Sequence, residues 1–180
     1  MPDIEKAYLL LKKYRKARST HTERIIQNEQ WYKLRHWECM RKSPKREVEP
    51  ASAWLFNCIA SKHADAMDNF PSANILPREE GDREEAKRLS QILPVILEQN
   101  DFEEVYHNVW DYKLKAGTGV YGIFWDPTKL NGLGDISIVP VDLLNLFWEP
   151  GVTDIQKSTH LFHVSLENKE SLVRRYPQLE

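Results

Sequence analysis

The sequence lacks the features that mark several large classes of protein. Only two of its 180 residues are cysteines, Cys39 and Cys58, so a disulfide framework is excluded and a reducing compartment is expected. Seven glycines and ten prolines exclude collagen and low-complexity chains. The longest apolar runs, such as residues 92–97, are too short to cross a bilayer, and the first residues lack a signal-peptide core. We therefore expect a soluble, intracellular protein with no membrane partner.

What the sequence does contain fits a globular protein of one domain, or slightly more than one. Apolar residues make up 41% of the chain and charged residues 29%, values typical of globular proteins. A chain of this length buries roughly 70% of the surface that it exposes when unfolded. We therefore expect a core that needs no covalent staples.

Helical periodicity dominates the first part of the sequence and strand-like alternation the last part. Helices are predicted over residues 4–18, from about 20 to 41, over 52–68, over 86–97 and from 101 to about 113. Pro94 should kink or split the fourth helix, and Asp101 with Glu104 resembles a capping box. Strands are predicted over residues 74–77, 120–125, 136–141, 146–148 and 160–166, and a last helix over 168–176. This order indicates an α+β fold, with amino-terminal helices before a small, mostly antiparallel sheet.

Charge and composition both divide the chain near residue 50. Residues 1–50 contain 13 lysines and arginines against 7 acidic residues, whereas residues 51–180 carry a net charge of −8. The segment 42–50 is charged, bounded by prolines and without periodicity, which is typical of a linker. We predict a basic helical arm with its linker at residues 1–49 and an α+β body at residues 50–180.

The densest positive charge lies in the first predicted helix. Five cations occur within seven residues: Lys12, Lys13, Arg15, Lys16 and Arg18. A solvated helix face is the ordinary explanation of such a run. The run is also typical of a site that grips phosphates, with Tyr8 and Tyr14 nearby, and Leu9 to Leu11 indicate an amphipathic docking helix. A basic arm on an acidic body fits either a polyanion or a second copy of the same chain.

Aromatic residues are concentrated in the second predicted helix. Trp31, Tyr32 and Trp37 fall within seven residues, and aromatics at this density need burial in the chain's own core or on a neighbour's surface. We predict that Trp31 and Trp37, together with the five cations, contact a neighbouring subunit or a polyanion.

The motifs that would indicate chemistry fail on context. Residues 117–122 read GTGVYG, but a dinucleotide site needs a strand before this motif and a helix after it. Here a helix precedes and a strand follows, so the glycines are interpreted as a turn. His36, Cys39, Cys58 and His63 resemble zinc ligands in type, but Cys58 and His63 would not converge on one helix. No serine has a nucleophile-elbow setting. We assign no catalytic residue, no cofactor and no metal.

From Pro50 onward the chain resembles a phage portal protein, the head-to-tail connector through which DNA enters the capsid. A series of phrases in the expected order carries the resemblance: AWLFN at 53–57, KHADAMDNFP at 62–71, LPREE at 76–80, ILPVILEQNDF at 92–102, GTGVYG at 117–122 with FW at 124–125, GDI at 134–136, VDLLNLFWEPG at 141–151 and DIQKS at 154–158. No single phrase is diagnostic, but the series is.

The resemblance implies a ring of identical subunits, typically twelve, at one vertex of the virion. Such rings dock the terminase during packaging, hold tail adaptor proteins, contact the capsid and let double-stranded DNA pass through; they assemble in the host cytoplasm. This stretch resembles the amino-terminal part of the outer wing. Family members are several hundred residues long, so the stem, clip and tunnel-lining segments would follow residue 180, and no residue is assigned to DNA contact.

Two functions from different classes follow from these observations. The first is a non-enzymatic structural subunit of a portal ring, serving DNA packaging and head-tail joining. The alternative is a stand-alone adaptor that binds nucleic acid through the basic amino-terminal helix. The second predicts binding of nonspecific duplex that weakens steeply with salt.

Overall fold

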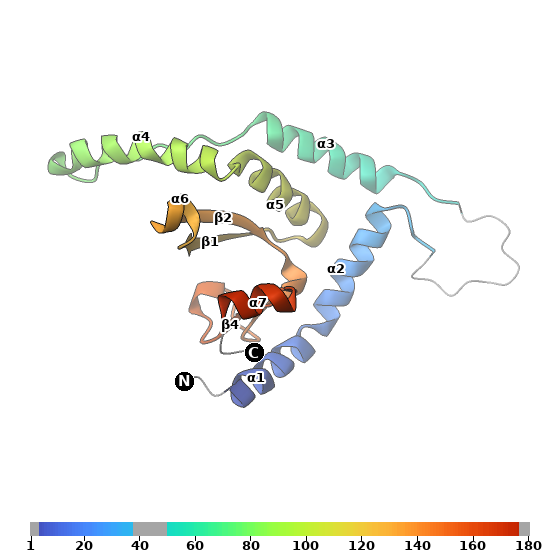
Figure 1. Cartoon of the computed structure of the whole chain (residues 1–180). Helices are drawn as coiled ribbons and strands as arrows, with labels where there is room; N and C mark the ends of the chain where they lie inside the picture. The colour runs from blue at the N-terminus through green and yellow to red at the C-terminus, as the bar shows by residue number, and fades with distance from the viewer. Residues whose placement is uncertain (1–3, 38–49, 177–180) are drawn as a thin grey trace, which may run out of the picture. The chain divides into compact units, whose positions relative to one another are not determined.

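The computed structural model describes residues 4–37 and 50–176 (Figure 1). These residues form two compact units, one from residues 4–20 and 143–176, the other from residues 21–37 and 50–142. The predicted linker lies almost entirely outside the described residues, as do Cys39 and the predicted end of the second helix near Arg41. The division into an arm at 1–49 and a body at 50–180 stays a prediction.

The second unit is built mainly from helices. These are most of α2 (Ser19–Tyr32), then α3 (Trp54–Asp68), α4 (Arg83–Gln99) after the 3-10 turn η1 (Glu80–Asp82), and α5 (Phe102–Ala116). Helix α5 lies at the centre because it packs against both α3 and α4. Its buried side chains Val105, Tyr106 and Val109 recur at steps of one and three residues, and Ile59 of α3 is buried with them. The apolar stripe predicted from the sequence is therefore the core of this unit.

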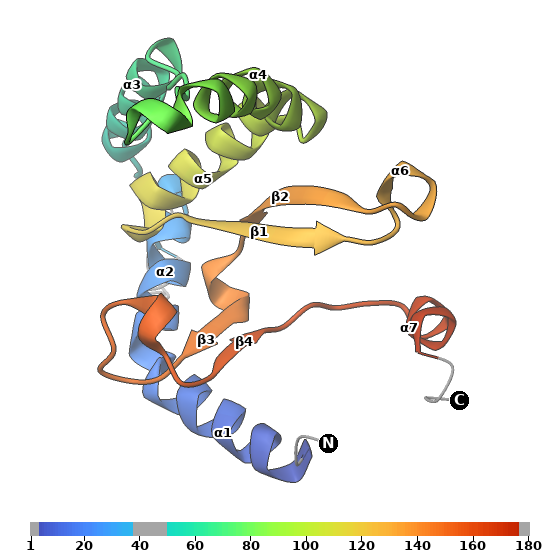
Figure 2. The ribbon, with the colours of Figure 1, turned by 90° about the vertical axis from the view of Figure 1, so that its left-hand side faces the viewer.

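A two-stranded hairpin completes the second unit. Strands β1 (Val120–Asp126) and β2 (Asp135–Val141) run antiparallel, and the short turn α6 (Lys129–Gly132) joins them at the tip, as Figure 2 shows. Strand β2 packs against α5, and Val141 at its end is buried. The predicted hairpin is confirmed.

The GTGVYG motif is the turn between α5 and β1. Gly117 ends α5 with a left-handed φ of 82°, and its N–H donates to the carbonyl of Lys113, the geometry of a helix carboxyl cap that favours glycine. Gly119 lies so close to α5 that a Cβ there would be 2.5 Å from the carbonyl oxygen of Val109. The interpretation of these glycines as a helix-to-strand turn is confirmed.

The first unit combines the amino-terminal helix with the last part of the chain. It contains α1 (Ile4–Ala17), η2 (Leu143–Asn145), β3 (Leu146–Trp148), η3 (Ile155–Lys157), β4 (Leu161–His163) and α7 (Lys169–Arg175). Strands β3 and β4 pair antiparallel. Helix α1 packs on β3, and the ring of Tyr14 meets that of Phe162 edge-on at 5.8 Å. Two small antiparallel ribbons with helices confirm the α+β class.

Several local predictions were wrong. Residues 74–77 form no strand, because the backbone of Ile75 pairs with a side chain: its N–H donates to Ser90 Oγ at 3.1 Å, and that hydroxyl donates to the Ile75 carbonyl at 3.2 Å. Helix α2 stops at Tyr32, where Leu34 takes a left-handed φ of 60°. The last predicted strand covers only Leu161–His163.

Two predictions about helices remain. Pro94 does not split its helix, since α4 runs from Arg83 to Gln99 without a break, because a long helix tolerates the loss of one hydrogen bond when packing holds it; the predicted kink stays a prediction. Asp101 makes no side-chain cap for α5, since its backbone is left-handed, with a φ of 47°. The predicted capping box is therefore absent.

Candidate subunit-contact surfaces

Helix α1 has an inner face, which packs on its own unit, and an outer face, which does not. Ala7, Leu10, Leu11 and Tyr14 recur at helical spacing and are buried or half-buried. Successive residues turn by about 100°, so the opposite side of the helix is a separate face. The outer face comprises Ile4, Glu5, Tyr8, Leu9, Lys12, Lys13, Arg15 and Lys16, all exposed. Lys13 lies at the edge of this face, where it also lines a small hollow with Leu10 and Glu149.

The outer face of α1 joins positive charge to exposed apolar side chains. Tyr8 is 64% exposed and Leu9 65%. Four of the five cations predicted as contact residues lie on this face: Lys12, Lys13, Arg15 and Lys16. Within the described residues none of the four forms an ion pair. The run is thus solvated in the isolated chain and available to a partner.

Arg18 differs from the other four cations because it is engaged within its own unit. Its guanidinium donates to the carbonyl of Leu146 and lies 4.1 Å from the centroid of the Trp148 ring. The Nη2 nitrogen is buried without a hydrogen-bond partner among the described residues. Burial lowers the pKa of Arg18, since a charge loses hydration there. Its visible role is to hold α1 on β3.

The two predicted tryptophans belong to the second unit, whereas the predicted cations belong to the first. Trp31 is 39% exposed and its ring stacks on that of His36 at 5.2 Å. Trp37 is half-buried, and its Nε1 donates to the carbonyl of Pro50 at 2.9 Å. The contact role predicted for Trp31 and Trp37 stays a prediction.

Lys115 ties α2 to α5 through a small ionic network that the sequence did not indicate. Its Nζ lies 2.7 Å from a carboxylate oxygen of Asp111 and 3.1 Å from one of Glu29, which also pairs with Lys33 at 2.9 Å. Burial alone would lower the pKa of Lys115, but the hydrogen bonds to Asp111 and Glu29 outweigh it and raise that pKa.

The same network lowers the pKa of Glu29. Burial acts in the opposite direction, and the hydrogen bonds from Lys33 and Lys115 outweigh it. Both partners therefore favour their charged forms. The backbone adds a second link, since Asn28 Nδ2 donates to the Lys115 carbonyl at 2.9 Å.

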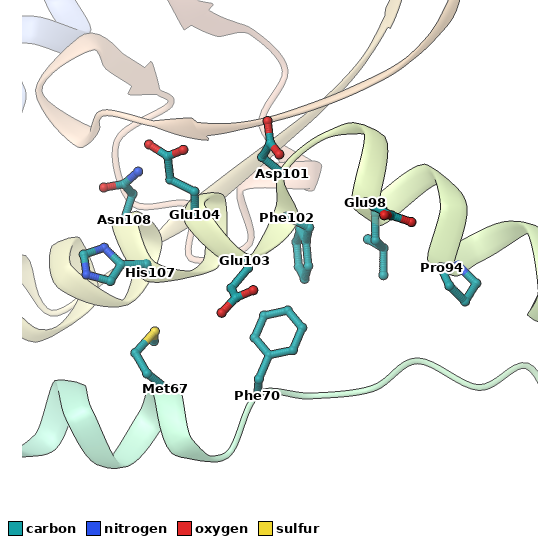
Figure 3. A pocket seen from close by; sticks show the side chains of 11 residues that line it. Met67, Phe70, Pro94, Glu98, Asp101, Phe102, Glu103, Glu104, His107 and Asn108 are labelled. Atoms are coloured by element: carbon teal, nitrogen blue, oxygen red, sulfur yellow. The ribbon is translucent and has the colours of Figure 1, made fainter.

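A cavity of about 900 Å³ opens between α3, α4 and α5 in the second unit. Apolar side chains and carboxylates line it together: Met67, Phe70, Pro94, Leu97, Glu98, Asp101, Phe102, Glu103, Glu104, His107 and Asn108. The rings of Phe70 and Phe102 lie 6.0 Å apart. In Figure 3, Glu103 extends from α5 toward Phe70 and Met67, whereas Asp101 and Glu104 extend to the other side of the helix. We call this cavity the α3–α5 groove.

No described cation forms an ion pair with the carboxylates of the α3–α5 groove. Glu98, Asp101, Glu103 and Glu104 are exposed and form no ion pair with another described residue. The helix dipole favours acids in the first turn of α5, which explains why Glu103 and Glu104 are tolerated there. Sequence analysis missed the groove, although the acids between two apolar helical stripes were the available signal.

One face of the β1–β2 hairpin is apolar along its length. The register pairs Tyr121 with Pro140, Ile123 with Ile138 and Trp125 with Ile136, and alternation places all six side chains on the same face. Ile123 is 68% exposed and Trp125 64%. An apolar face this exposed is typical of a surface that a partner covers.

Of the four residues that resembled zinc ligands in type, Cys39 lies outside the described residues, and His36, Cys58 and His63 belong to no metal-binding group in the described part of the chain. His63 instead meets His107, with ring centroids 4.3 Å apart and its Nε2 3.2 Å from the His107 carbonyl oxygen. Cys58 is a free, exposed thiol. In the part of the chain that is described, no three His, Cys, Asp or Glu side chains are placed to hold a metal ion.

Taken together, these surfaces are suited to binding. The described residues offer an unpaired basic helix face, an acidic groove and an apolar ribbon, each exposed to a possible partner.

None of the helices in residues 4–37 and 50–176 combines the length and the apolar character that crossing a bilayer requires.

Comparison with known proteins identifies the family. No curated protein matches the chain. The family model of the phage P22-like portal protein matches residues 64–180, which is well over half of the 180 residues and contains α4, α5 and both ribbons. The resemblance noted in the sequence is therefore confirmed, and this chain belongs to the phage P22-like portal protein family.

Proposed function

We propose that this chain is the wing part of a phage portal ring, a structural subunit that serves DNA packaging and the joining of head and tail. The match of residues 64–180 to the portal family carries this proposal. The portal family is structural, and we propose a non-enzymatic role for this chain without cofactor or metal. Motor activity would belong to the terminase.

The exposed surfaces support assembly with other proteins. A subunit of a ring must present two different faces to its two neighbours, because the contacts run head to tail. The outer face of α1 and the apolar face of the hairpin provide exposed Tyr8, Leu9, Ile123 and Trp125. Monomeric proteins rarely leave such side chains grouped in the open.

The proposed partners are identical subunits, typically twelve in a ring, together with terminase, capsid and tail adaptor proteins. Double-stranded DNA would pass through the complete ring. The proposed location is the portal vertex of the virion, reached after assembly in the host cytoplasm. We also propose that residues 1–49 act as a basic arm and residues 50–180 as the body.

The position in the particle tests this proposal. An epitope tag inserted in the exposed turn at Gly81, where a side chain would meet nothing within 4 Å, is placed in the phage gene. Gold-labelled antibody on disrupted particles should mark one vertex per capsid in electron micrographs. Label spread over all vertices would contradict a portal role. So would purified particles without label, when the tagged protein is detected in the lysate of the infected host.

A second function rests on the four unpaired cations of α1. Lys12, Lys13, Arg15 and Lys16 share the outer face with Tyr8, an arrangement that suits phosphates and stacked bases. This alternative expects the chain to shift nonspecific duplex DNA at low salt, with an affinity that falls steeply as salt rises. Absence of any shift at about 50 mM salt would remove it.

A further inference from the structure

The outer face of α1 and the α3–α5 groove are complementary in charge and in apolar character. The first carries four cations without an ion-pair partner among the described residues, and the second is lined by four carboxylates in the same condition, of which Asp101 and Glu104 extend to the other side of α5 (Figure 3). Other exposed charges, such as Lys87 and Arg88 of α4, also lack an ion-pair partner among the described residues. The two sets are complementary because they are opposite in sign and each lies beside exposed apolar side chains.

The apolar residues of the two surfaces also correspond. Tyr8 and Leu9 stand exposed beside the cations of α1, and Met67, Phe70 and Phe102 line the α3–α5 groove. Phe70 is 41% exposed although its ring contacts those of Phe102 and Tyr106. An amphipathic helix that enters an apolar groove is a common mode of recognition.

We propose that the outer face of α1 of one copy docks in the α3–α5 groove of a second copy, with Lys12 and Lys16 facing Glu98 and Glu103. Tyr8 and Leu9 then cover Phe70 and Met67. This proposal deepens the proposed function and rests on it, because it assigns the two faces that neighbouring subunits of a ring would use. The contact is head to tail, the type of interface that forms a ring when the rotation between successive copies closes.

A second copy explains the observations better than nucleic acid does. A polyanion would neutralise the cations of α1 but would leave Leu9 uncovered, and it would leave the carboxylates of the α3–α5 groove without a partner. A second copy satisfies both charged sets at once and buries both apolar sets. Electrostatic complementarity of this kind fixes the register of an interface and excludes wrong partners.

Two charge-reversed variants of the whole chain test the contact. Variant A carries Lys12→Glu and Lys16→Glu, and variant B carries Glu98→Lys and Glu103→Lys. Each variant alone places like charges at the paired positions 12, 16, 98 and 103, so its self-association, measured by analytical ultracentrifugation, should weaken about tenfold or more at 0.1 M salt. An equimolar mixture should associate again, because the new carboxylates at positions 12 and 16 of A can pair with the new lysines at positions 98 and 103 of B.

Matched reversals show whether position, rather than net charge, is responsible. Lys87→Glu with Arg88→Glu changes two exposed cations of α4, and Glu23→Lys with Glu79→Lys changes two exposed acids. These control variants should associate like the original chain. Circular dichroism of all variants should remain that of the original chain, since every changed side chain is exposed.

Three outcomes would overturn the contact. Docking between copies requires that the original chain self-associates at high concentration, so a chain that stays monomeric at about 100 μM contradicts the proposed contact. A mixture of A and B that fails to associate contradicts docking between copies. Loss of DNA binding in variant A with unchanged self-association favours the nucleic-acid alternative instead. The vertex label described above is independent of all three, so failure of the contact leaves the portal role standing.

Discussion

The two compact units are assembled from the chain in different ways. The second unit is drawn from one continuous part of the sequence, residues 21–142, whereas the first combines residues from the beginning with residues from 143 onward. In the first unit the bond from Arg18 to the Leu146 carbonyl joins residues 128 positions apart. In the second unit packing connects successive elements, such as α4 with α5 and β1 with β2, and also elements further apart in the sequence, such as α3 with α5.

This difference affects how each unit holds its helices. In the second unit Lys115 links α2 to α5 through two carboxylates. In the first unit Arg18 links α1 to β3 through a carbonyl and the Trp148 ring, without a carboxylate. Stability in proteins varies by region, so changes confined to one unit should lower hydrogen-exchange protection there and leave the other unit unchanged.

The largest effect is expected from Gly119→Ala in the second unit. The new Cβ would lie 2.5 Å from the backbone oxygen of Val109, and backbone cannot move aside by a rotamer change. Overpacking of this kind costs about 3 kcal/mol, which should appear in chemical denaturation and as faster amide exchange in α5 and β1. Gly81→Ala is the control, because nothing lies within 4 Å of its Cβ. Equal effects of the two changes would contradict the close approach of β1 to α5.

The next effect is expected from Arg18→Ala in the first unit. It removes a charged hydrogen bond and a cation–π contact, and it leaves the Leu146 carbonyl without that donor, for a loss of about 2 kcal/mol. Exchange should accelerate in α1 and β3 but not in α5. Arg15→Ala, on the exposed side of the same helix, should change stability by less than about 0.5 kcal/mol. Faster exchange in α5 would break the separation of the two units.

A smaller loss is expected from Lys115→Met in the second unit. The side chain is 13% exposed, but Glu29 and Asp111 are 34% and 30% exposed, so water can hydrate the carboxylates that lose their partner. The expected cost is therefore about 1 kcal/mol. Salt should weaken the original chain more than the variant. Lys87→Met, at an exposed position of α4, should have no measurable effect, and a similar loss there would remove the role assigned to the network.

The sequence predicted the second unit better than the first, for a physical reason. Periodicity reports which face of an element is buried, and in the second unit the element that buries it is close in the sequence. The stripe of α5 and the β1–β2 hairpin were therefore predicted correctly. Periodicity does not indicate which distant element a buried face packs against, so the packing of Tyr14 against Phe162 was not predicted.

One error within the second unit arose where a side chain replaces a backbone partner. The hydroxyl of Ser90 forms hydrogen bonds with both backbone groups of Ile75, and the propensities of residues 74–77 do not indicate this.

The candidate contact residues could be predicted only as a set. The five cations were predicted together, but tertiary contact separates Arg18 from Lys12, Lys13, Arg15 and Lys16. The α3–α5 groove needs three helices at once, which no local pattern describes.

The smallest expected effect is a pH dependence that arises from Glu29 in the second unit. Hydrogen bonds from Lys33 and Lys115 outweigh burial and keep the pKa of Glu29 below its unfolded value, about 4.3. This group therefore adds stability above that pH, and the contribution is lost as pH falls through the lower, folded pKa. Because Glu29 is 34% exposed, solvent screening limits the effect to about 0.5 kcal/mol.

Between pH 5 and pH 3, about the range of carboxyl titration, the original chain should lose more stability than Glu29→Gln. Arg18 stays charged throughout this range, so the curve of Arg18→Ala should run parallel to that of the original chain. Parallel curves for Glu29→Gln as well would mean that the α2–α5 network does not favour the charged carboxylate.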